Sequence, residues 1–338
     1  MIQYSEQISL QKYNTFGIDV RASRFFSYSE VEELQSFIQK GFDTSLPFFI
    51  LGGGSNVLFL NDYDGTVIHP QNVGITIIAQ TESFVRVQVG AGENWDNFVA
   101  WAVGQNLYGV ENLSHIPGSV GASAVQNIGA YGSEVSSVIF EVHTIDLRNG
   151  TTYVYSNQQC DFAYRSSLFK QIHMKSQVIT QVVYTLQKQG ECNVSYGSLQ
   201  REIEARGEVN LHSVRQAIIA TRNQKLPNPD EIGNAGSFFK NPVISKLQFI
   251  SLQQAYPSIV WFTADNDSVK IAAGWLIDAL GLKGYSLGNA QVHPKQALVL
   301  TNTGGATGKD IKQLAEYIQQ KVFLATGIEL EPEVIYLS

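Results

Sequence analysis

The stretch HIPGSVGASAVQNIGAYG, residues 115–132, decides the fold, because it places four glycines among small and polar residues. The glycines leave backbone N–H groups open to approach, which is the arrangement that holds a diphosphate. The polar residues Ser119, Gln126 and Asn127 could recognise the edges of a cofactor. A second loop of this kind, LGGGSNVLF (51–59), follows an apolar run. Either loop alone also fits a structural turn, but the pair favours a dinucleotide site.

The usual nucleotide fingerprints are missing from this chain. The stretch GGATGKD (304–310) nearly matches a phosphate-binding P-loop, but its first glycine is one position too close and Asp310 replaces the Ser or Thr that would hold magnesium. We interpret it as the start of a helix. The stretch VGAGENW lacks the third glycine of the Rossmann motif. The two loops therefore favour a bulky dinucleotide bound in a non-Rossmann way, such as FAD.

Composition excludes several classes of protein. The 338 residues include 44% hydrophobic ones and carry a net charge of -7 without a dense Lys/Arg cluster, so we expect neither nucleic-acid nor membrane binding. The N-terminus has no signal-peptide pattern, which predicts a cytoplasmic protein. Two isolated cysteines and six scattered histidines predict no disulfide and no metal site. Our expectation for the oligomeric state is a monomer.

Helix and strand patterns divide the chain into three regions. Residues 1–70 hold a helix signal at 29–41, capped by Ser29, and a strand–turn–strand pattern at 47–59. Strands dominate residues 71–208, including a hairpin that turns at 148–150 and one helix at 93–106. Residues 209–332 carry helix signals at 211–224, 268–281 and 308–327, and the final segment 333–338 is a strand that we expect to return to the first region.

Ten segments between residues 13 and 334, taken in order, are similar to motifs of one flavoprotein family. They are YNTFGI, LGGGSN, IPGSVGAS, QNIGAYG, FAYRSS, KLPNP, GNAGSFFKNP, AGWLIDALGLKGY, HPKQALVL and LEPEV. The chain resembles the UDP-N-acetylenolpyruvoylglucosamine reductases (MurB) of bacterial cell-wall precursor synthesis. The segment NVSYGSLQREI further resembles the subtype whose tyrosine loop folds onto the substrate. Asn289, where a glycine is common, and Pro294, where a basic residue is often seen, depart from the pattern.

The resemblance implies an α+β fold of three parts. An FAD-binding pair of subdomains of the PCMH/vanillyl-alcohol-oxidase type, residues 1–70 and 71–208, precedes an α+β substrate-binding domain, residues 209–332. It also implies a reaction in two halves. NADPH reduces FAD, and the reduced flavin then gives a hydride to C3 of the enolpyruvyl group of UDP-N-acetyl-enolpyruvoylglucosamine. The product is UDP-N-acetylmuramate.

Three residues match the catalytic positions of the family. The hydride leaves negative charge at C2 and on the substrate carboxylate, which Arg165 is suited to stabilise by its planar fork. Glu333 matches a position that contacts the same end of the substrate, and we expect it to share a proton there, since a bare anion would repel the charge. Ser237 matches the proton donor to C2. Its neighbour Gly236 is expected to allow close backbone approach, with Phe238 and Phe239 packed behind.

The remaining site residues are also implied by the resemblance. Those that match substrate positions are Tyr164, Tyr196, Lys225, Asn241 and Gln296. Those that match FAD positions, mainly through backbone groups, are Gly52, Gly53, Gly54, Ser55, Asn56, Ser119, Val120, Gly121, Asn127, Ala130 and Tyr131. Two rival functions are a flavin oxidase of the same superfamily and a nucleotide-sugar binding protein without activity. The presence of Arg165, Ser237 and Glu333 disfavours the latter.

Overall fold

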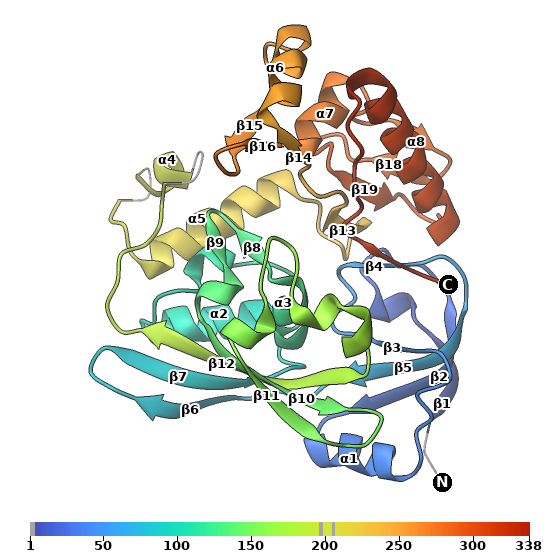
Figure 1. The fold of residues 1–338 in the computed structure, drawn as a ribbon, viewed down its shortest axis with the longest axis vertical. Coiled ribbons are helices and arrows are strands. Elements are labelled where there is room, and N and C mark those ends of the chain that lie inside the picture. Colours follow the sequence, from blue (N-terminus) through green and yellow to red (C-terminus); the bar gives the residue numbers. More distant parts are fainter. Residues whose placement is uncertain (1–3, 196–198, 205–206) are drawn as a thin grey trace. The chain divides into compact units, whose positions relative to one another are not determined.

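The computed structural model describes residues 4–195, 199–204 and 207–338, and the chain divides into two compact units. The first unit comprises residues 1–8, 22–53 and 64–222, and the second comprises residues 9–21, 54–63 and 223–338. Figure 1 shows the elements of both in sequence colours.

A four-stranded sheet and one helix form one part of the first unit. The sheet has the order β1-β2-β5-β3 and consists of β1 (Ser5–Ser9), β2 (Arg21–Tyr28), β5 (Tyr63–Pro70) and β3 (Phe48–Ile50). Helix α1 (Val31–Gln39) buries Leu34, Phe37 and Ile38. Its cap is Glu30 and not the expected Ser29, because the Glu33 carboxylate accepts the amides of both residues, at 2.8 Å from Ser29 and 3.2 Å from Glu30.

A five-stranded antiparallel sheet forms the other part of the first unit. Its order is β11-β10-β12-β7-β6, and its strands are β11 (Thr152–Ser156), β10 (Ile139–Asp146), β12 (Gln177–Gln187), β7 (Phe84–Gly90) and β6 (Ile75–Gln80). Helices α2 (Trp95–Gly104) and α3 (Val120–Gln126) lie over this sheet in Figure 1 and share its apolar core. The expected hairpin is confirmed, since β10 and β11 pair through the turn at 147–151.

Short elements complete the first unit. They are η2 (Glu111–Leu113), β8 (Gly129–Ala130), β9 (Ser133–Glu134), η3 (Val135–Ser137), η4 (Gln158–Cys160), η5 (Leu168–Lys170), η6 (Ile172–Met174), α4 (Leu199–Glu204) and α5 (Leu211–Lys225). Residues 211–222 of α5 belong to this unit, where Leu211 joins the core.

Two small sheets and three α-helices build most of the second unit. One sheet has the order β13-β19-β18-β17, and the other has the order β14-β16-β15. The strands are β13 (Gly233–Ser237), β19 (Val299–Asn302), β18 (Ala290–Val292), β17 (Ser286–Leu287), β14 (Val243–Ser245), β16 (Ser268–Ile271) and β15 (Trp261–Thr263). The helices are α6 (Lys246–Ala255), α7 (Ala273–Ala279) and α8 (Gly308–Thr326), and a 3-10 turn, η1, spans Gln11–Tyr13.

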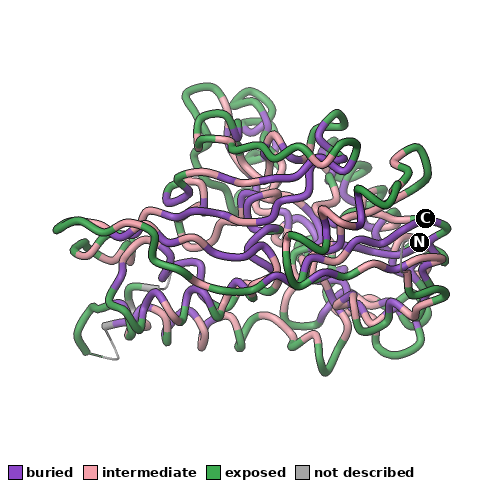
Figure 2. The backbone as a smooth tube through the Cα atoms, turned by 90° about the horizontal axis from the view of Figure 1, so that it is seen from below, coloured by how far each residue is buried: buried purple, intermediate pink, exposed green. Residues whose placement is uncertain are grey.

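Helix α8 follows the sequence prediction closely. Thr307 and Asp310 form a capping box at its start, which confirms a helix start in place of a P-loop, and Gly327 ends it in the left-handed conformation at φ 69°. The predicted apolar face is buried, with Ile311, Leu314, Ile318 and Val322 all at 0% exposure. Figure 2 shows the contrast between such buried segments and the exposed loops.

The C-terminal strand β20 (Ile335–Leu337) pairs in parallel with β4 (Val57–Phe59). The strand therefore pairs with a segment before residue 70, but that segment, residues 54–63, belongs to the second unit. The strands predicted at 47–59 are both present, but β3 pairs with β5 whereas β4 pairs with β20, so they belong to different sheets.

The structure differs from the sequence prediction in three further places. The expected boundary near residue 208 falls at 222, and two earlier segments join the second unit, because backbone pairing draws them to distant strands. The helix expected over 268–281 begins only at Ala273, since residues 268–271 pair with β14 and β15 as strand β16. Part of the glycine loop at 115–132 is helix α3. Within the described residues, no helix is long and apolar enough to span a bilayer.

Candidate active site

The two glycine loops in the first unit lie against each other. A Cβ added at Gly53 would lie 2.7 Å from the Cα of Gly118, and one added at Gly52 would lie 2.7 Å from the Oγ of Ser119. Only glycine allows the two backbones to approach this closely. Across the described residues, the amides of Gly52 and Gly53 donate no hydrogen bond. Unused backbone donors in a loop without side chains fit the phosphate groups of a dinucleotide.

Gly54 has a different neighbour, in the second unit. A Cβ there would lie 1.9 Å from the carbonyl oxygen of Tyr13, and its φ of 65° is unfavourable for other residues. The carbonyl of Gly54 accepts the amide of Thr15 at 3.1 Å. The next two predicted residues, Ser55 and Asn56, belong to the same unit, and Asn56 donates through Nδ2 to the carbonyl of Glu333 at 3.1 Å.

The predicted FAD residues on α3 are largely committed to the protein itself. The amides of Val120 and Gly121 donate to the carbonyls of Glu93 and Ala91, both at 2.9 Å. These two residues can therefore shape a binding site but cannot donate backbone hydrogen bonds to a ligand. Ser119 is the N-cap of α3, and its side chain accepts the amide of Ala122 at 3.5 Å. The backbone amide of Ser119 donates no hydrogen bond to a described residue.

Asn127 is a fully used structural amide. Its Nδ2 donates to Glu134 Oε2 and to the carbonyl of Ala163, both at 2.9 Å, and its Oδ1 accepts the amide of Ser136 at 3.2 Å. The residue is fully buried, with a left-handed φ of 47°. The Asn127 side chain has no N–H left to donate to a cofactor, and its backbone amide already donates to the carbonyl of Ala124 at 3.4 Å.

Backbone strain gathers in this region of the first unit. Five non-glycine residues between 115 and 165 have a left-handed φ: His115 (60°), Asn127 (47°), Tyr131 (49°), Asp161 (46°) and Arg165 (55°). Such conformations are costly for side-chain-bearing residues and cluster at functional sites. Three of the five were predicted as site residues from the sequence.

Arg165 is held in place by contacts with the glycine loop at 115–132 and with Lys170 of η5. Its Nη2 donates to the carbonyl of Gly129 at 3.0 Å, and Lys170 Nζ donates to the Arg165 carbonyl at 2.7 Å. A Cβ at Gly129 would lie 3.2 Å from Nη1 of Arg165, so the glycine makes room for the guanidinium. The guanidinium also lies 5.4 Å from the ring centre of Tyr164, a predicted substrate residue.

Ser237 and Glu333, far apart in sequence, meet in the second unit. The carbonyl of Phe238 accepts the amide of Glu333 at 2.8 Å, and the carbonyl of Glu331 accepts the amide of Lys240 at 2.9 Å. Ser237 ends strand β13 opposite Val299, with its side chain exposed. The structure thus brings two predicted catalytic residues to one place.

The neighbours of Ser237 fix its position. Phe238 and Phe239 are buried, and the ring of Phe238 contacts those of Phe16 and Tyr336, which confirms that both rings pack behind the loop. A Cβ at Gly236 would meet no protein atom within 4 Å, and its φ of 66° favours glycine there; the expected close backbone approach stays a prediction.

The other predicted substrate residues divide into two groups. Asn241 and Gln296 both lie beside the start of α7: Asn241 Oδ1 accepts the amide of Ala273 at 3.0 Å, and a Cβ at Gly274 would lie 3.4 Å from Gln296 Oε1. Lys225 is exposed at the end of α5. Tyr196 lies outside the described residues.

Comparison with known proteins gives the family. The model named UDP-N-acetylenolpyruvoylglucosamine reductase, C-terminal domain, matches residues 228–337, and the FAD binding domain matches residues 22–156. The reductase of Bacteroides fragilis is 47% identical over 98% of this chain and 99% of its own length. The chain belongs to the UDP-N-acetylenolpyruvoylglucosamine reductase family. The family member from Flavobacterium johnsoniae is 41% identical, with 98% and 99% of the two chains covered.

The fold of the reductase family also matches. The crystal structure of the reductase from Thermus caldophilus aligns with a TM-score of 0.71 over the whole of both chains, at 22% identity. The predicted α+β fold with an FAD-binding domain is therefore confirmed. The FAD binding domain match includes both Gly52–Gly53 and the 115–132 stretch.

An ion-pair cluster between helices α2 and α5 was not predicted from the sequence of this reductase. Arg215 on α5 donates to both carboxylate oxygens of Asp96 on α2, at 2.6 and 2.9 Å, and Asp96 also accepts the amide of His115 at 2.5 Å. Burial raises the pKa of Asp96, but the hydrogen bonds from Arg215 and His115 together lower it by more than burial raises it. The pKa of Asp96 therefore lies below its usual value. Arg222 then donates to the His115 carbonyl at 2.9 Å.

Asn112 and Asn234 were also missed. Both are buried amides that fix loops: Asn234 donates to the carbonyls of Pro227 and Ile232 and accepts the amide of Gly236, just before Ser237. Asn residues in polar loops resemble ordinary turn residues in the sequence. No local pattern separates a surface asparagine from one that is buried by contacts with distant segments.

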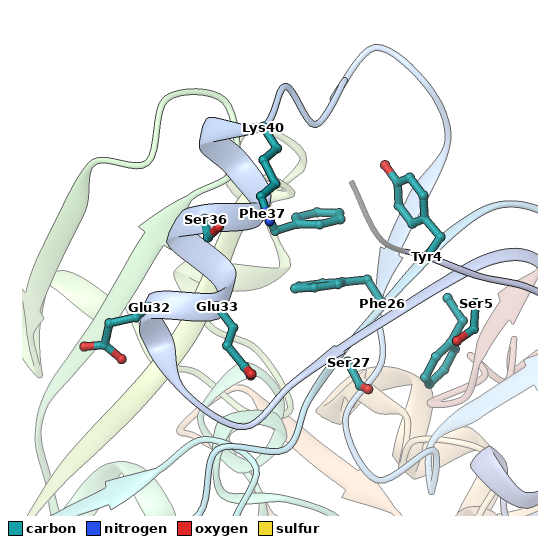
Figure 3. A pocket seen from close by; sticks show the side chains of 10 residues that line it. Tyr4, Ser5, Phe26, Ser27, Glu32, Glu33, Ser36, Phe37 and Lys40 are labelled. Atoms are coloured by element: carbon teal, nitrogen blue, oxygen red, sulfur yellow. The ribbon is translucent and has the colours of Figure 1, made fainter. Parts of the chain in front are cut away.

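A cavity in the first unit lies away from the predicted site residues. It has a volume of about 550 Å³ and lies between β2 and α1, and no predicted site residue lines it. Figure 3 shows the Phe26 and Phe37 rings face to face there, at 3.8 Å between centroids. Because these two rings already stack on each other, the cavity offers no open aromatic slot. We assign it no part in the site.

Proposed function

We propose that this protein reduces UDP-N-acetyl-enolpyruvoylglucosamine to UDP-N-acetylmuramate, with NADPH as the reductant. The observation that supports it most is the short backbone contact between Phe238 and Glu333, which sets Ser237 beside Glu333. Membership of the reductase family supplies the substrate class. The free Gly52 and Gly53 amides suit the phosphates of FAD.

FAD held against the Gly52 and Gly53 amides would supply hydride chemistry at C3 of the enolpyruvyl group, with NADPH as the source of the electrons. Ser237 donates the proton to C2. A serine hydroxyl is a weak acid, but an enolate-like carbon is basic enough to accept from it, and a positioned acid of this kind contributes about 10² to 10⁴ in rate. The packed Phe238 ring behind the serine limits its motion.

Arg165 and Glu333 act on the substrate carboxylate. As negative charge spreads onto that group, the Arg165 guanidinium offers donors that are already oriented by Gly129. Preorganisation matters here because donors that need not move cost nothing at the moment of reaction. Glu333 is oriented through its backbone by Phe238 and Asn56, and it shares a proton with the carboxylate.

The sugar nucleotide is bound by residues of the C-terminal half. Asn241 and Gln296, on either side of the start of α7, contact the nucleotide sugar, while Lys225 and Tyr196 hold the diphosphate. Lys225 adds a local positive charge for the diphosphate, in a chain whose net charge is -7. We further propose that the enzyme is cytoplasmic and monomeric.

Anaerobic stopped-flow spectroscopy tests this function. NADPH is expected to bleach the yellow protein, and enolpyruvyl-UDP-N-acetylglucosamine is expected to restore the colour in a second step. Rapid restoration by oxygen alone, with none by the sugar nucleotide, would show a flavin oxidase instead. A protein that binds UDP-sugars but is never bleached by NADPH would be a binding protein without activity.

A further inference from the structure

Asn112 connects two loops of the first unit through one side chain. It lies in η2 and is 2% exposed. Its Nδ2 group donates to the carbonyl of Tyr131 at 3.0 Å and to the carbonyl of Asn193 at 2.8 Å. Both N–H bonds of the amide are thereby used, one for each loop.

The first of the two loops contains the predicted flavin residues Ala130 and Tyr131. Tyr131 holds a left-handed φ of 49°, a conformation that a side-chain-bearing residue keeps only when its surroundings enforce it. The hydrogen bond from Asn112 to the Tyr131 carbonyl fixes the orientation of this peptide group.

The second loop is the segment 192–195, which precedes Tyr196. Asn193 orders it locally, because its Oδ1 accepts both the amide and the hydroxyl of Ser195, at 3.2 and 2.8 Å. Cys192 and Val194 pack, together with Tyr131, against one small apolar cluster, formed by Ile203, Val214, Ala217 and Ile218. The two loops therefore share a packed floor as well as the amide of Asn112.

The acceptor end of the Asn112 side chain also indicates that this residue connects the two loops. Its Oδ1 is buried and, among the described residues, accepts no hydrogen bond. An unsatisfied buried acceptor is unfavourable. The unsatisfied oxygen reduces what this side chain contributes to stability. Its Nδ2 group, in contrast, uses both N–H bonds to join two carbonyls.

We propose that Asn112 is a positioning residue that couples the flavin loop at 130–131 to the segment at 192–195. Through this amide, binding at one loop favours the binding geometry of the other. FAD therefore raises the affinity for the sugar nucleotide, and the reverse holds by the same factor. The inference rests on the proposed function, which gives the two loops their ligands.

The test compares Asn112→Asp and Asn112→Ser with a matched control, Asn72→Asp. An aspartate has no N–H to donate, while a serine keeps one donor. Asn72 is also a buried amide, 5% exposed, with an unsatisfied Oδ1, and its Nδ2 donates to the carbonyl of Thr180 at 2.6 Å. The control loses a similar buried bond, which joins the loop between β5 and β6 to strand β12.

Two affinities are measured for each protein. FAD binding to the flavin-free protein is followed by quenching of flavin fluorescence, and UDP-N-acetylmuramate binding is followed by calorimetry with and without FAD. For Asn112→Asp we expect both dissociation constants to rise about tenfold. We also expect that FAD no longer increases the affinity for UDP-N-acetylmuramate. Asn72→Asp is expected to lower the urea midpoint but to keep both affinities and the enhancement.

The outcomes separate the inference from the proposed function. Asn112 variants that lose stability yet keep the mutual enhancement within twofold would overturn the inference. A wild-type protein that binds FAD but no UDP-sugar would overturn the proposed function instead. If Asn112→Asp fails to fold, Asn112→Ser decides by hydrogen exchange: faster exchange in both 127–132 and 192–195 supports the coupling, and faster exchange in only one of them contradicts it.

Discussion

The amide of Glu333 donates to the carbonyl of Phe238 at 2.8 Å, and this bond helps to join the C-terminal segment to the residues that directly follow Ser237. An isolated bridge between Phe239 and Pro332 continues the pairing. Both segments are held through their backbones, so neither of these contacts depends on the side chain of Ser237 or of Glu333. The arrangement predicts that each side chain can be changed without loss of the fold.

Replacement of Ser237 by alanine is expected to separate the two half-reactions. Bleaching by NADPH needs no proton on carbon and should keep a near-normal rate. Restoration of colour by the enolpyruvyl substrate should slow by about 10² to 10⁴. Single-turnover stopped-flow measurements on the two halves check this result. Equal slowing of both halves would mean that the hydroxyl only shapes the site, and an unchanged urea midpoint controls for folding.

Gly53→Ala is expected to weaken FAD binding. The new Cβ would lie 2.7 Å from the Cα of Gly118, so one of the two loops must move, at a cost of about 1–3 kcal/mol. The dissociation constant for FAD should rise about tenfold or more, as measured by fluorescence titration. Gly104→Ala is the control, because a Cβ at that position on α2 meets nothing within 4 Å. Equal affinity in both variants would contradict a tight contact between the loops.

Replacement of Asp96 by asparagine is expected to make the free energy of unfolding depend less on pH in the acid range. The folded-state pKa of Asp96 lies below its unfolded value of 3.8, so its stabilisation is complete above that pH and is lost as the pH falls through the folded pKa. Asp96→Asn should cost roughly 1–3 kcal/mol at pH 7, because Arg215 loses its charged partner. Urea titrations between pH 7 and pH 3 should converge for the two proteins at the acid end. Parallel curves would contradict the assignment.

Both thiols are expected to be unreactive in the native protein. Burial raises the pKa of Cys160 to about 12, and burial with the nearby Glu111 carboxylate raises that of Cys192 to about 11. Since the thiolate is the reactive form, labelling with Ellman's reagent at pH 8 should be slow before denaturation and fast after it. Unfolded thiols ionise near pH 9, so the free energy of unfolding should fall as the pH rises above that value. A rapid native reaction of either cysteine would contradict this.

Local patterns were enough to predict many of the elements. The spacing of Ile311, Leu314, Ile318 and Val322 predicts the buried face of α8, and the turn residues near Gly150 predict the β10–β11 hairpin. These elements are set by contacts between residues close in sequence. The match of ten motifs in order also predicted the family and its FAD-binding fold, which the comparisons confirm.

Exact boundaries were less predictable, because neighbouring segments compete for the same residues. Residues 268–271 form a strand in place of the expected helix, since β14 and β15 offer them hydrogen-bonding partners. The cap of α1 moved from Ser29 to Glu30, because Glu33 can reach both amides from one turn away. A local sequence pattern does not show which of two nearby partners is closer.

The sequence by itself determined the chemistry that this chain carries: a serine, an arginine and a glutamate in family contexts, with glycine loops that suit FAD. Only the tertiary structure decided which backbone groups are already used, as at Val120 and Gly121, and which side chains join distant segments, as at Asn112. It also set Glu333 beside Ser237. The physical reason is that these contacts join residues far apart in the chain, where pairing depends on the packing of whole segments rather than on local periodicity.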